Sequence, residues 1–283
     1  MERLDEVRAR IAGVEGLRDV VGALRSLAAV RMQQAAERLP GLRRYEETIA
    51  GAIGWALALS TVEREPSPRA PGRRAVFVFC AEHGFVGPFN DRLVEAAAAE
   101  LARAGGRLIV VGARGALRAS QRGLVIDRAL PMATHPDGVF ETARRVAREL
   151  ARRIEAQTVD EAVAVAARHA PGAPLLVESH PLLPPELERF RAAEERAPPL
   201  SNLPAPALLD ALAGEHVVAR LARAAMESLA AESATRLQAM EAAHQNTERR
   251  LGDLVALERR LRQDEASGEL SDLVNGLDAL DER

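Results

Sequence analysis

The sequence predicts an α/β protein in which the N- and C-terminal helices form a long antiparallel coiled-coil hairpin. This hairpin carries an inserted small βαβ domain with a mostly parallel sheet. Three observations lead to this fold class. Residues 208–280 contain no proline and space their apolar residues mostly by threes and fours. Residues 4–39 repeat that spacing at the other end of the chain. Between them, short β-prone runs alternate with helical stretches.

The first helix is expected over residues 2–60. Steps of three and four form the narrow seam of a coiled coil rather than the broad face of a globular helix. Pro40 and Gly41 predict a kink or a local irregularity within this helix. The apolar residues that make up the seam are Leu4, Val7, Ile11, Val14, Leu17, Val21, Leu24, Ala28, Met32, Ala35 and Leu39.

The middle of the chain reads as alternating strands and helices after a turn-rich linker at residues 65–72. Strands joined by helices favour parallel pairing in a compact sheet. A proline-bearing connector is expected to begin at Pro181 and to run through Pro206. The expected strands are 75–80, 107–111, 124–129, 159–167 and 175–180, and the expected helices are 90–104, 113–121 and 138–156.

The last helix, expected over 208–280, is too long to bury its apolar stripe against a compact core, so it needs a partner helix. Either stripe taken singly is explained equally well by an ordinary core helix. Together, at the two ends of one chain, they favour the hairpin. The predicted division is an N-terminal helix at 1–62, an inserted α/β domain at 73–200, and a C-terminal helix at 204–283 that pairs with the first.

Composition excludes several classes of function. With a net charge of −3 and a pI near 6.1, the chain has no bulk attraction to nucleic acid or anionic lipid. A single cysteine, Cys80, excludes an intramolecular disulfide and fits a reducing compartment. The N-terminus lacks a secretory signal pattern. The longest uncharged run, residues 48–62, is too short to cross about 30 Å of hydrocarbon.

Two glycine pairs follow the first two predicted strands, Gly84 with Gly87 and Gly112 with Gly115. A phosphate cradle needs glycines where backbone N–H groups approach the anion at the start of a helix. Neither stretch has the full G-x-G-x-x-G or G-x-x-x-x-G-K-[ST] pattern. Tight strand-to-helix turns are therefore favoured over a nucleotide site, and no cofactor is expected.

Other chemistry-bearing residues are scattered. None of the six histidines forms a short-spaced pair with another histidine or with Cys80, so no metal site is expected. Cys80 ends an apolar strand and is expected to be a buried, inert thiol. Five arginines lie on one predicted helix with few acidic neighbours: Arg144, Arg145, Arg148, Arg152 and Arg153. A solvated face is the default interpretation, and a docking patch for an acidic partner is the alternative.

Three stretches, taken together, resemble the gamma subunit of F-type ATP synthases. Residues 10–14 and 23–31 are similar to the first helix of that family. Residues 81–90 are similar to its S-D-x-G-L-C-G-G-F-N stretch and keep Gly84, Gly87, Phe89 and Asn90. The last helix matches at the family's spacing, and the resemblance covers the whole chain in order. The matching residues there are Arg236, Met240, Asn246, Arg262, Gln263, Glu269, Leu270 and Gly276.

The sequence also departs from the family pattern. Arg25 and Ser26 stand where the family has Lys and Met, and Glu258 and Arg259 stand where it has Tyr and Asn. These departures indicate a divergent member, and an alternative or ion-specialised ATPase is one interpretation of it.

The resemblance implies a central-stalk rotor that couples ion-driven rotation of the c-ring to ATP synthesis or hydrolysis at the beta subunits. The implied partners are the alpha and beta subunits of the catalytic hexamer, the epsilon subunit and the c-ring, without nucleic acid or direct membrane insertion. It further implies a non-catalytic subunit, without a cofactor, at the cytoplasmic face of the bacterial inner membrane.

The resemblance also implies roles for individual residues. Arg262, Gln263 and Glu269 fall where the family's rotor contacts the beta subunits. Gly84, Gly87, Phe89 and Asn90 form a structural motif of the α/β domain. A terminal stripe is expected to turn in an apolar bearing at the top of the hexamer: Leu270, Leu273, Val274, Leu277 and Leu280.

Two other functions stay open on the sequence. A non-rotary coiled-coil adaptor or chaperone with an α/β head explains the hairpin equally well, but it does not explain the matched motifs. A small nucleotide-using enzyme would need a phosphate loop or a catalytic constellation. Nucleotide binding by the isolated chain would separate the enzyme from the rotor.

Overall fold

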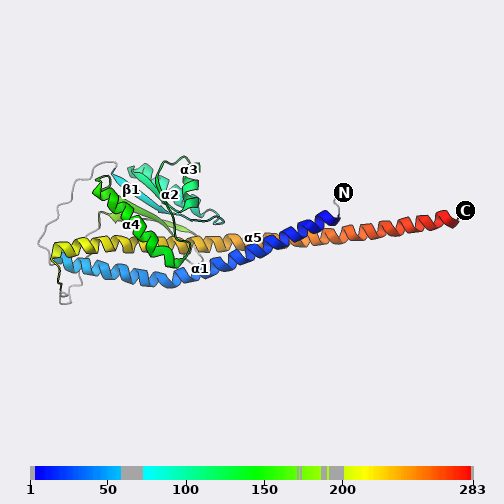
Figure 1. Cartoon of the computed structure of the whole chain (residues 1–283), viewed down its shortest axis with the longest axis horizontal. Helices are drawn as coiled ribbons and strands as arrows, with labels where there is room; N and C mark the ends of the chain where they lie inside the picture. The colour runs from blue at the N-terminus through cyan, green and yellow to red at the C-terminus, as the bar shows by residue number, and fades with distance from the viewer. Residues whose placement is uncertain are drawn as a thin grey trace. The chain divides into compact units, whose positions relative to one another are not determined.

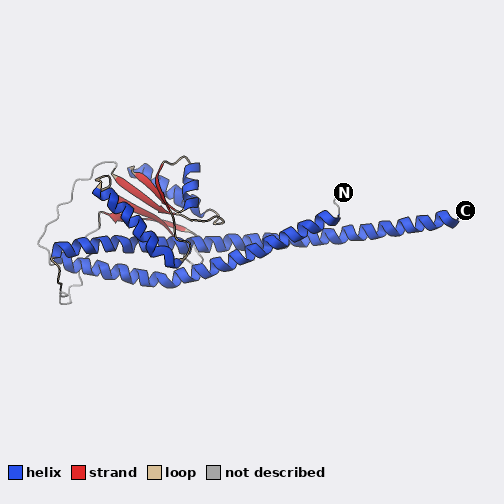
Figure 2. Cartoon of the chain, in the orientation of Figure 1, coloured by secondary structure: helices blue, strands red, loops and turns tan. Residues whose placement is uncertain are grey.

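The computed structural model describes residues 4–58, 73–170, 172, 174–185, 190 and 201–281, with the side chains of 271–281 outside the description. Two long helices, α1 (Leu4–Ala58) and α5 (Ala205–Asp281), contain nearly half of the chain (Figures 1 and 2). The chain separates into two compact units. Unit 1 is Met1–Leu27 with Leu237–Arg283, and unit 2 is Ala28–Arg236. Both helices contribute to both units.

In unit 1 the two helices run antiparallel. Arg8 Nε lies 3.1 Å from a carboxylate oxygen of Glu258, and Arg18 Nε lies 4.0 Å from one of Glu248. A step of ten residues forward along α1 is thus matched by ten residues backward along α5. This constant register is that of the predicted antiparallel coiled coil.

Burial along α1 follows a seven-residue repeat with one gap. The buried positions on this repeat are Val7, Val21, Ala28, Ala35, Leu42, Ile49 and Ala56. Val14, which also falls on it, is only half-buried, and Ile53 and Gly54 are buried beside it. A repeat of seven keeps one row of side chains facing a partner helix along a supercoil.

The second seam row of α1 differs from the prediction. Leu17 was assigned to the seam, but its side chain is 52% exposed. Arg18 and Arg25 are half-buried in its place, and Arg25 Nη1 lies 3.0 Å from a carboxylate oxygen of Glu241. Arginine can cover apolar surface with its aliphatic stem while its guanidinium pairs with a carboxylate across the seam. The prediction of Leu17 as a seam residue, which came from apolar periodicity alone, is therefore wrong, and its neighbour Arg18 takes that position.

The predicted weak point at Pro40 does not interrupt α1, which is assigned as helix from Leu4 to Ala58 with Pro40 inside it. Pro40 removes one backbone N–H from the helical ladder. Among the described helices, none is both long and apolar enough to cross a membrane.

Unit 2 contains a five-stranded sheet in the order β3-β2-β1-β4-β5. The first four strands pair in parallel, and β5 runs antiparallel to β4 at one edge. This confirms the mostly parallel sheet of an inserted α/β domain. The strands are β1 (Arg74–Phe79), β2 (Arg107–Val111), β3 (Ile126–Leu130), β4 (Glu161–Arg168) and β5 (Leu176–Leu183).

Helices cover both faces of the sheet (Figure 1). On one face, α2 (Phe89–Ala104) and α3 (Ala113–Gln121) pack against Val76 and Val78 of β1. On the other, α4 (Val139–Glu155), which follows the short 3₁₀ turn η1 (Pro136–Gly138), packs with α1 and α5 against Phe77 and Phe79. Alternate residues of β1 thus enter the two cores, as period-two geometry requires.

Most predicted elements lie within two or three residues of their observed bounds, and β2 and α3 have the predicted bounds. One of the largest differences is at the end of β5. The sequence placed a connector from Pro181 onward, yet the strand continues to Leu183. Pro181 lies opposite Val163, next to a register irregularity, on a strand paired on one side only. An edge strand tolerates a residue that cannot donate to the ladder. The predicted linker 65–72 lies outside the described residues.

Candidate functional site

The strongest site candidate lies at the carboxyl edge of the sheet in unit 2. The chain leaves β1 towards β2 on one side, and β4 lies on the other, so strand order reverses between β1 and β4. In open α/β sheets, ligands bind in the crevice outside the carboxyl ends of the strands at such a reversal. Here that crevice holds part of α5. We call the loop 81–90 and the α5 segment 228–236 the junction.

Ser228 joins α5 to both strands of the crevice. Its hydroxyl donates a hydrogen bond to the carbonyl oxygen of Phe79 at 3.0 Å and accepts one from the N–H of Ala167 at 2.9 Å. The side chain is fully buried. The last residue of β1 and the end of β4 are therefore bridged by one side chain of the long helix, where a doubly wound enzyme would hold its ligand.

One and two turns further along α5, Glu232 and Arg236 form a buried ion pair. Arg236 Nη2 lies 2.6 Å from Glu232 Oε1, and Arg236 also donates to the carbonyl oxygen of Gly84 at 3.3 and 3.4 Å. Burial raises the pKa of Glu232, and the nearby guanidinium of Arg236 opposes that shift. This pair attaches α5 to the loop that follows β1.

The four motif residues of the α/β domain lie in this loop. The side-chain oxygen of Asn90 accepts a hydrogen bond from the N–H of Ala81 at 2.9 Å, which closes the loop. Phe89 is fully buried in the core beneath α2. Gly84 offers the carbonyl that Arg236 binds, and Gly87 has a φ of +49°, a conformation that favours glycine. Gly84 and Gly87 thus lie next to Arg236 and Thr235 of α5, and Phe89 shares a core with Ala231 of the same helix.

Glu82 occupies the position where an anion would otherwise bind. Its carboxylate accepts hydrogen bonds from the N–H of Ala113, at the start of α3, at 3.1 Å and from the N–H of Met132 at 2.9 Å. Free N–H groups at a helix start are the usual donors to a phosphate. The chain satisfies these donors with its own carboxylate.

The second glycine pair serves packing rather than phosphate binding. A Cβ at Gly115 would lie 2.0 Å from the Cβ of Cys80, and one at Gly112 would lie 2.4 Å from the carbonyl oxygen of Cys80. Both glycines let α3 approach the end of β1 closely. Cys80 is buried, and burial raises the pKa of its thiol, so it stays protonated and unreactive.

The predicted contact residues near the end of α5 belong to unit 1, whereas the junction belongs to unit 2. Arg262, Gln263 and Glu269 are all exposed. The guanidinium of Arg262 bonds within its own helix to Glu258 at 2.8 Å. Leu270 is exposed. The side chains of Leu273, Val274, Leu277 and Leu280 lie outside the described residues, although all four belong to α5.

Sequence reasoning missed Glu82, Ser228 and Glu232. The signal was present as polar residues four apart on α5, at 228, 232 and 236, inside an alanine-rich stretch. Such spacing aligns side chains on one helix face. Within the described ranges, no group of three or more histidine, cysteine or carboxylate side chains could hold a metal ion.

These features define a class of protein. An α/β domain has its ligand crevice filled by a long helix, and that helix pairs with a second helix of the same chain. The ligand crevice is occupied by the chain's own side chains.

Comparison with known proteins agrees with this class. A family model described as ATP synthase matches residues 3–280. An ATP synthase gamma chain of Chlorobium luteolum is 30% identical, with 99% of each chain covered. One of Parafrankia sp. is also 30% identical, with 98% of each covered. A Euglena gracilis mitochondrial ATP synthase structure shares the fold at a TM-score of 0.63 and 16% identity, covering 98% of this chain and 94% of that one.

The chain belongs to the gamma-chain family of ATP synthases. The match extends over nearly the full length of both this chain and its relatives, so it includes the two long helices as well as the inserted domain.

Proposed function

We propose that this chain is the rotating central stalk of an F-type ATP synthase. It couples ion-driven rotation of the c-ring to ATP synthesis or hydrolysis at the beta subunits. The observation that carries the proposal is the junction. Within unit 2, Ser228 bonds α5 to the ends of β1 and β4, and Arg236 bonds it to the loop after β1. The same helix continues into the coiled coil of unit 1. A torque applied to the α/β domain therefore reaches the helix through buried hydrogen bonds as well as through packing.

The stalk acts by differential contact. An asymmetric helix pair presents a different surface to each of three beta subunits and so stabilises a different nucleotide-binding conformation in each. Rotation changes nucleotide affinity although the stalk touches no nucleotide, which is a coupling between distant sites.

Arg262, Gln263 and Glu269 are the proposed contacts to the beta subunits. The exposure of Arg262 supports this role. Its side chain is 62% exposed, and its bond to Glu258 joins residues one turn apart on the helix surface. Such a guanidinium can exchange its partner for a carboxylate of a passing subunit and form paired hydrogen bonds. The stripe of Leu270, Leu273, Val274, Leu277 and Leu280 is the proposed apical bearing.

The subunit is proposed to be non-catalytic and free of cofactor, with 1–62 and 204–283 as rotor helices and 73–200 as the inserted domain. The filled crevice and the Glu82 carboxylate at the start of α3 support this proposal. Its partners are the alpha and beta subunits, the epsilon subunit and the c-ring. The chain is a peripheral subunit of a membrane complex, and the cytoplasmic face of the bacterial inner membrane is its proposed location.

The test is to purify the tagged chain from its own cells and to assay ATPase activity of the assembly that accompanies it. We expect three copies each of two larger subunits per copy of this chain, with activity. The isolated chain is expected not to bind ATP. A chain that purifies alone, or that binds ATP with an affinity typical of enzymes, would overturn the proposal.

A further inference from the structure

An open groove of about 560 Å³ lies between α4 and α5 within unit 2. Its floor is made of small and apolar side chains, and Ile154 on its wall is 44% exposed. A Cβ at Gly214 would meet no atom within 4 Å, so a partner backbone can approach α5 closely there. The floor and wall residues are Ala147, Ala151 and Ile154 of α4 and Gly214, Val217 and Val218 of α5.

Arginines border this groove. Arg144 and Arg148 line it from α4 together with one carboxylate, Glu141, and Arg152 follows one turn later on the same exposed row. Arg148 shares Glu141 with Arg145, at 3.1 and 3.5 Å. At four-residue spacing the row presents a guanidinium about every 6 Å along the helix.

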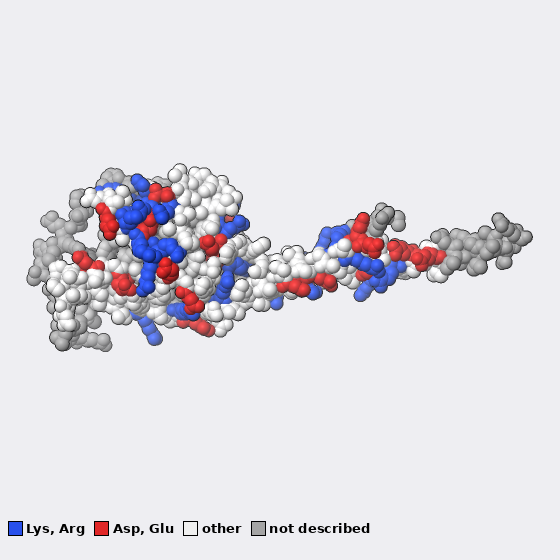
Figure 3. Space-filling model, in the orientation of Figure 1, with Lys and Arg blue, Asp and Glu red and all other residues white. Residues whose placement is uncertain are grey.

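The row belongs to a larger arginine patch. Figure 3 shows basic side chains gathered over α4. This patch holds seven arginines and three carboxylates, Asp127, Glu141 and Glu149, although the chain as a whole is acidic with a net charge of −3. We define the patch as Arg107, Arg128, Arg144, Arg145, Arg148, Arg152 and Arg153.

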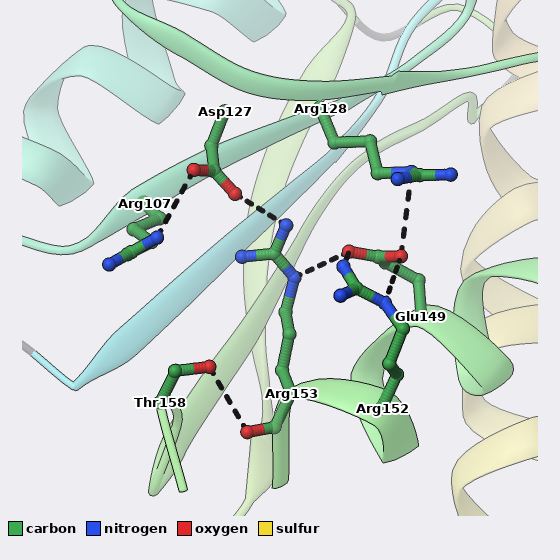
Figure 4. Close-up of polar contacts among 7 residues, drawn as sticks. All are labelled: Arg107, Asp127, Arg128, Glu149, Arg152, Arg153 and Thr158. Atoms are coloured by element: carbon green, nitrogen blue, oxygen red, sulfur yellow. Dashed lines mark hydrogen bonds and ion pairs between the residues drawn. The ribbon is translucent and has the colours of Figure 1, made fainter. Parts of the chain in front are cut away.

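Buried contacts hold part of the patch in place. Arg153 is buried and bonds both Asp127 and Glu149 (Figure 4). Glu149 also accepts from Arg152 at 2.7 Å, and Arg128 lies 3.4 Å from it. The guanidinium groups of Arg128 and Arg152 are thus positioned before any partner arrives, which lowers the entropic cost of binding one.

We propose that this groove and its arginine row bind an acidic amphipathic helix of a partner protein. The apolar side of that helix lies on the floor, and its carboxylates, one turn apart, face Arg144, Arg148 and Arg152. A groove between two helices suits an amphipathic helix because apolar anchors recur at every turn. Fixed guanidinium forks match carboxylates in pairs. A flat lipid surface would not fill a concave floor of alanine and valine.

The inference goes beyond the proposed function and rests on it only in taking the partner to be a subunit of the same assembly.

The test uses the assembly purified from the protein's own cells. A photo-crosslinking amino acid is placed at Ile154, with a matched control at Val125, which is 87% exposed and does not line the groove. The crosslinked peptide is identified by mass spectrometry.

We expect Ile154 to crosslink to a helical partner peptide with carboxylates one turn apart, and Val125 not to do so. Arg144→Gln combined with Arg148→Gln should lower the yield about tenfold, and so should Ala151→Glu on the exposed floor. Arg92→Gln, at an exposed arginine of α2 on the other face of the sheet, should leave the yield unchanged.

Crosslinks to a second copy of this chain, to lipid, to a basic or non-helical peptide, or to no partner would overturn the inference. Failure of the rotor proposal is detected by a separate measurement. The subunits of the purified assembly are identified before irradiation, and the absence of the two expected larger subunits would count against the rotor.

Discussion

Removing the hydroxyl of Ser228 tests whether the junction joins α5 to the sheet. Ser228→Ala leaves the carbonyl of Phe79 and the N–H of Ala167 buried without their present partner. Each buried backbone group left unpaired costs roughly 1–3 kcal/mol, so for the two groups we expect a loss of about 2–6 kcal/mol in the stability of unit 2. The side chain shrinks by one oxygen atom only, so little of this loss would come from packing.

The chain offers a matched control. Ser233 lies on the same helix and is equally buried, but its hydroxyl has no hydrogen-bond partner within the described structure. Ser233→Ala removes an unpaired polar group and is expected to leave the stability unchanged or slightly raised. The two variants therefore separate the hydrogen bonds of Ser228 from the mere loss of a buried hydroxyl.

The assay is amide hydrogen exchange of the folded chain, read at Ala167, together with the thermal midpoint. A loss of 2 kcal/mol corresponds to exchange about 30-fold faster at this amide. Ser228→Ala should also lower the thermal midpoint, whereas Ser233→Ala should not. Equal exchange rates at Ala167 in the two variants would refute the view that Ser228 bridges α5 to the strands.

Three further changes test other parts of the chain. Arg262→Ala should weaken the coupling of ATP hydrolysis to ion pumping while circular dichroism stays the same, and undiminished pumping would contradict the proposed beta-subunit contact. Arg25→Glu should lower the midpoint of urea unfolding only slightly because its pair with Glu241 is half-exposed, and adding Glu241→Arg should recover that loss. Burial raises the pKa of Glu100, but hydrogen bonds, including those from Arg103 and Arg74, outweigh it and hold the pKa at about 2. Because this pKa lies below its ordinary value of 4.5, its stabilising contribution is complete above that value and is lost as pH falls towards 2. Thermal midpoints measured from pH 6 to pH 2.5 should fall less steeply in Glu100→Gln than in the parent, and parallel curves would count against this.

The core positions of the strands followed from local sequence. An unbroken β-prone run such as 75–80 has no other stable place than a sheet covered on both faces, so its burial could be predicted without tertiary information. The edge position of β5 could not be predicted in this way. In the middle of a sheet, the same residues would end the strand. Pro181 is tolerated because, among the described residues, no strand pairs with the outer side of β5.

The charged residues of the coiled-coil seam could not be predicted from the sequence pattern either. Leu17 and Arg18 are neighbours, and apolar periodicity favours Leu17. The position of Glu248 on α5 decides in favour of Arg18, and that register depends on how two segments 230 residues apart are paired.

By itself, the sequence determined the hairpin of two long helices, the inserted parallel sheet and the resemblance to the gamma chain, because periodicity and motif spacing are properties of local segments. Only the tertiary structure decided that α5 fills the ligand crevice through Ser228 and that Glu82 covers the start of α3. It also brought α4 beside α5 to form the arginine-bordered groove. These features depend on which side chains meet across long sequence separations, and that follows from packing the whole domain at once rather than from any one segment.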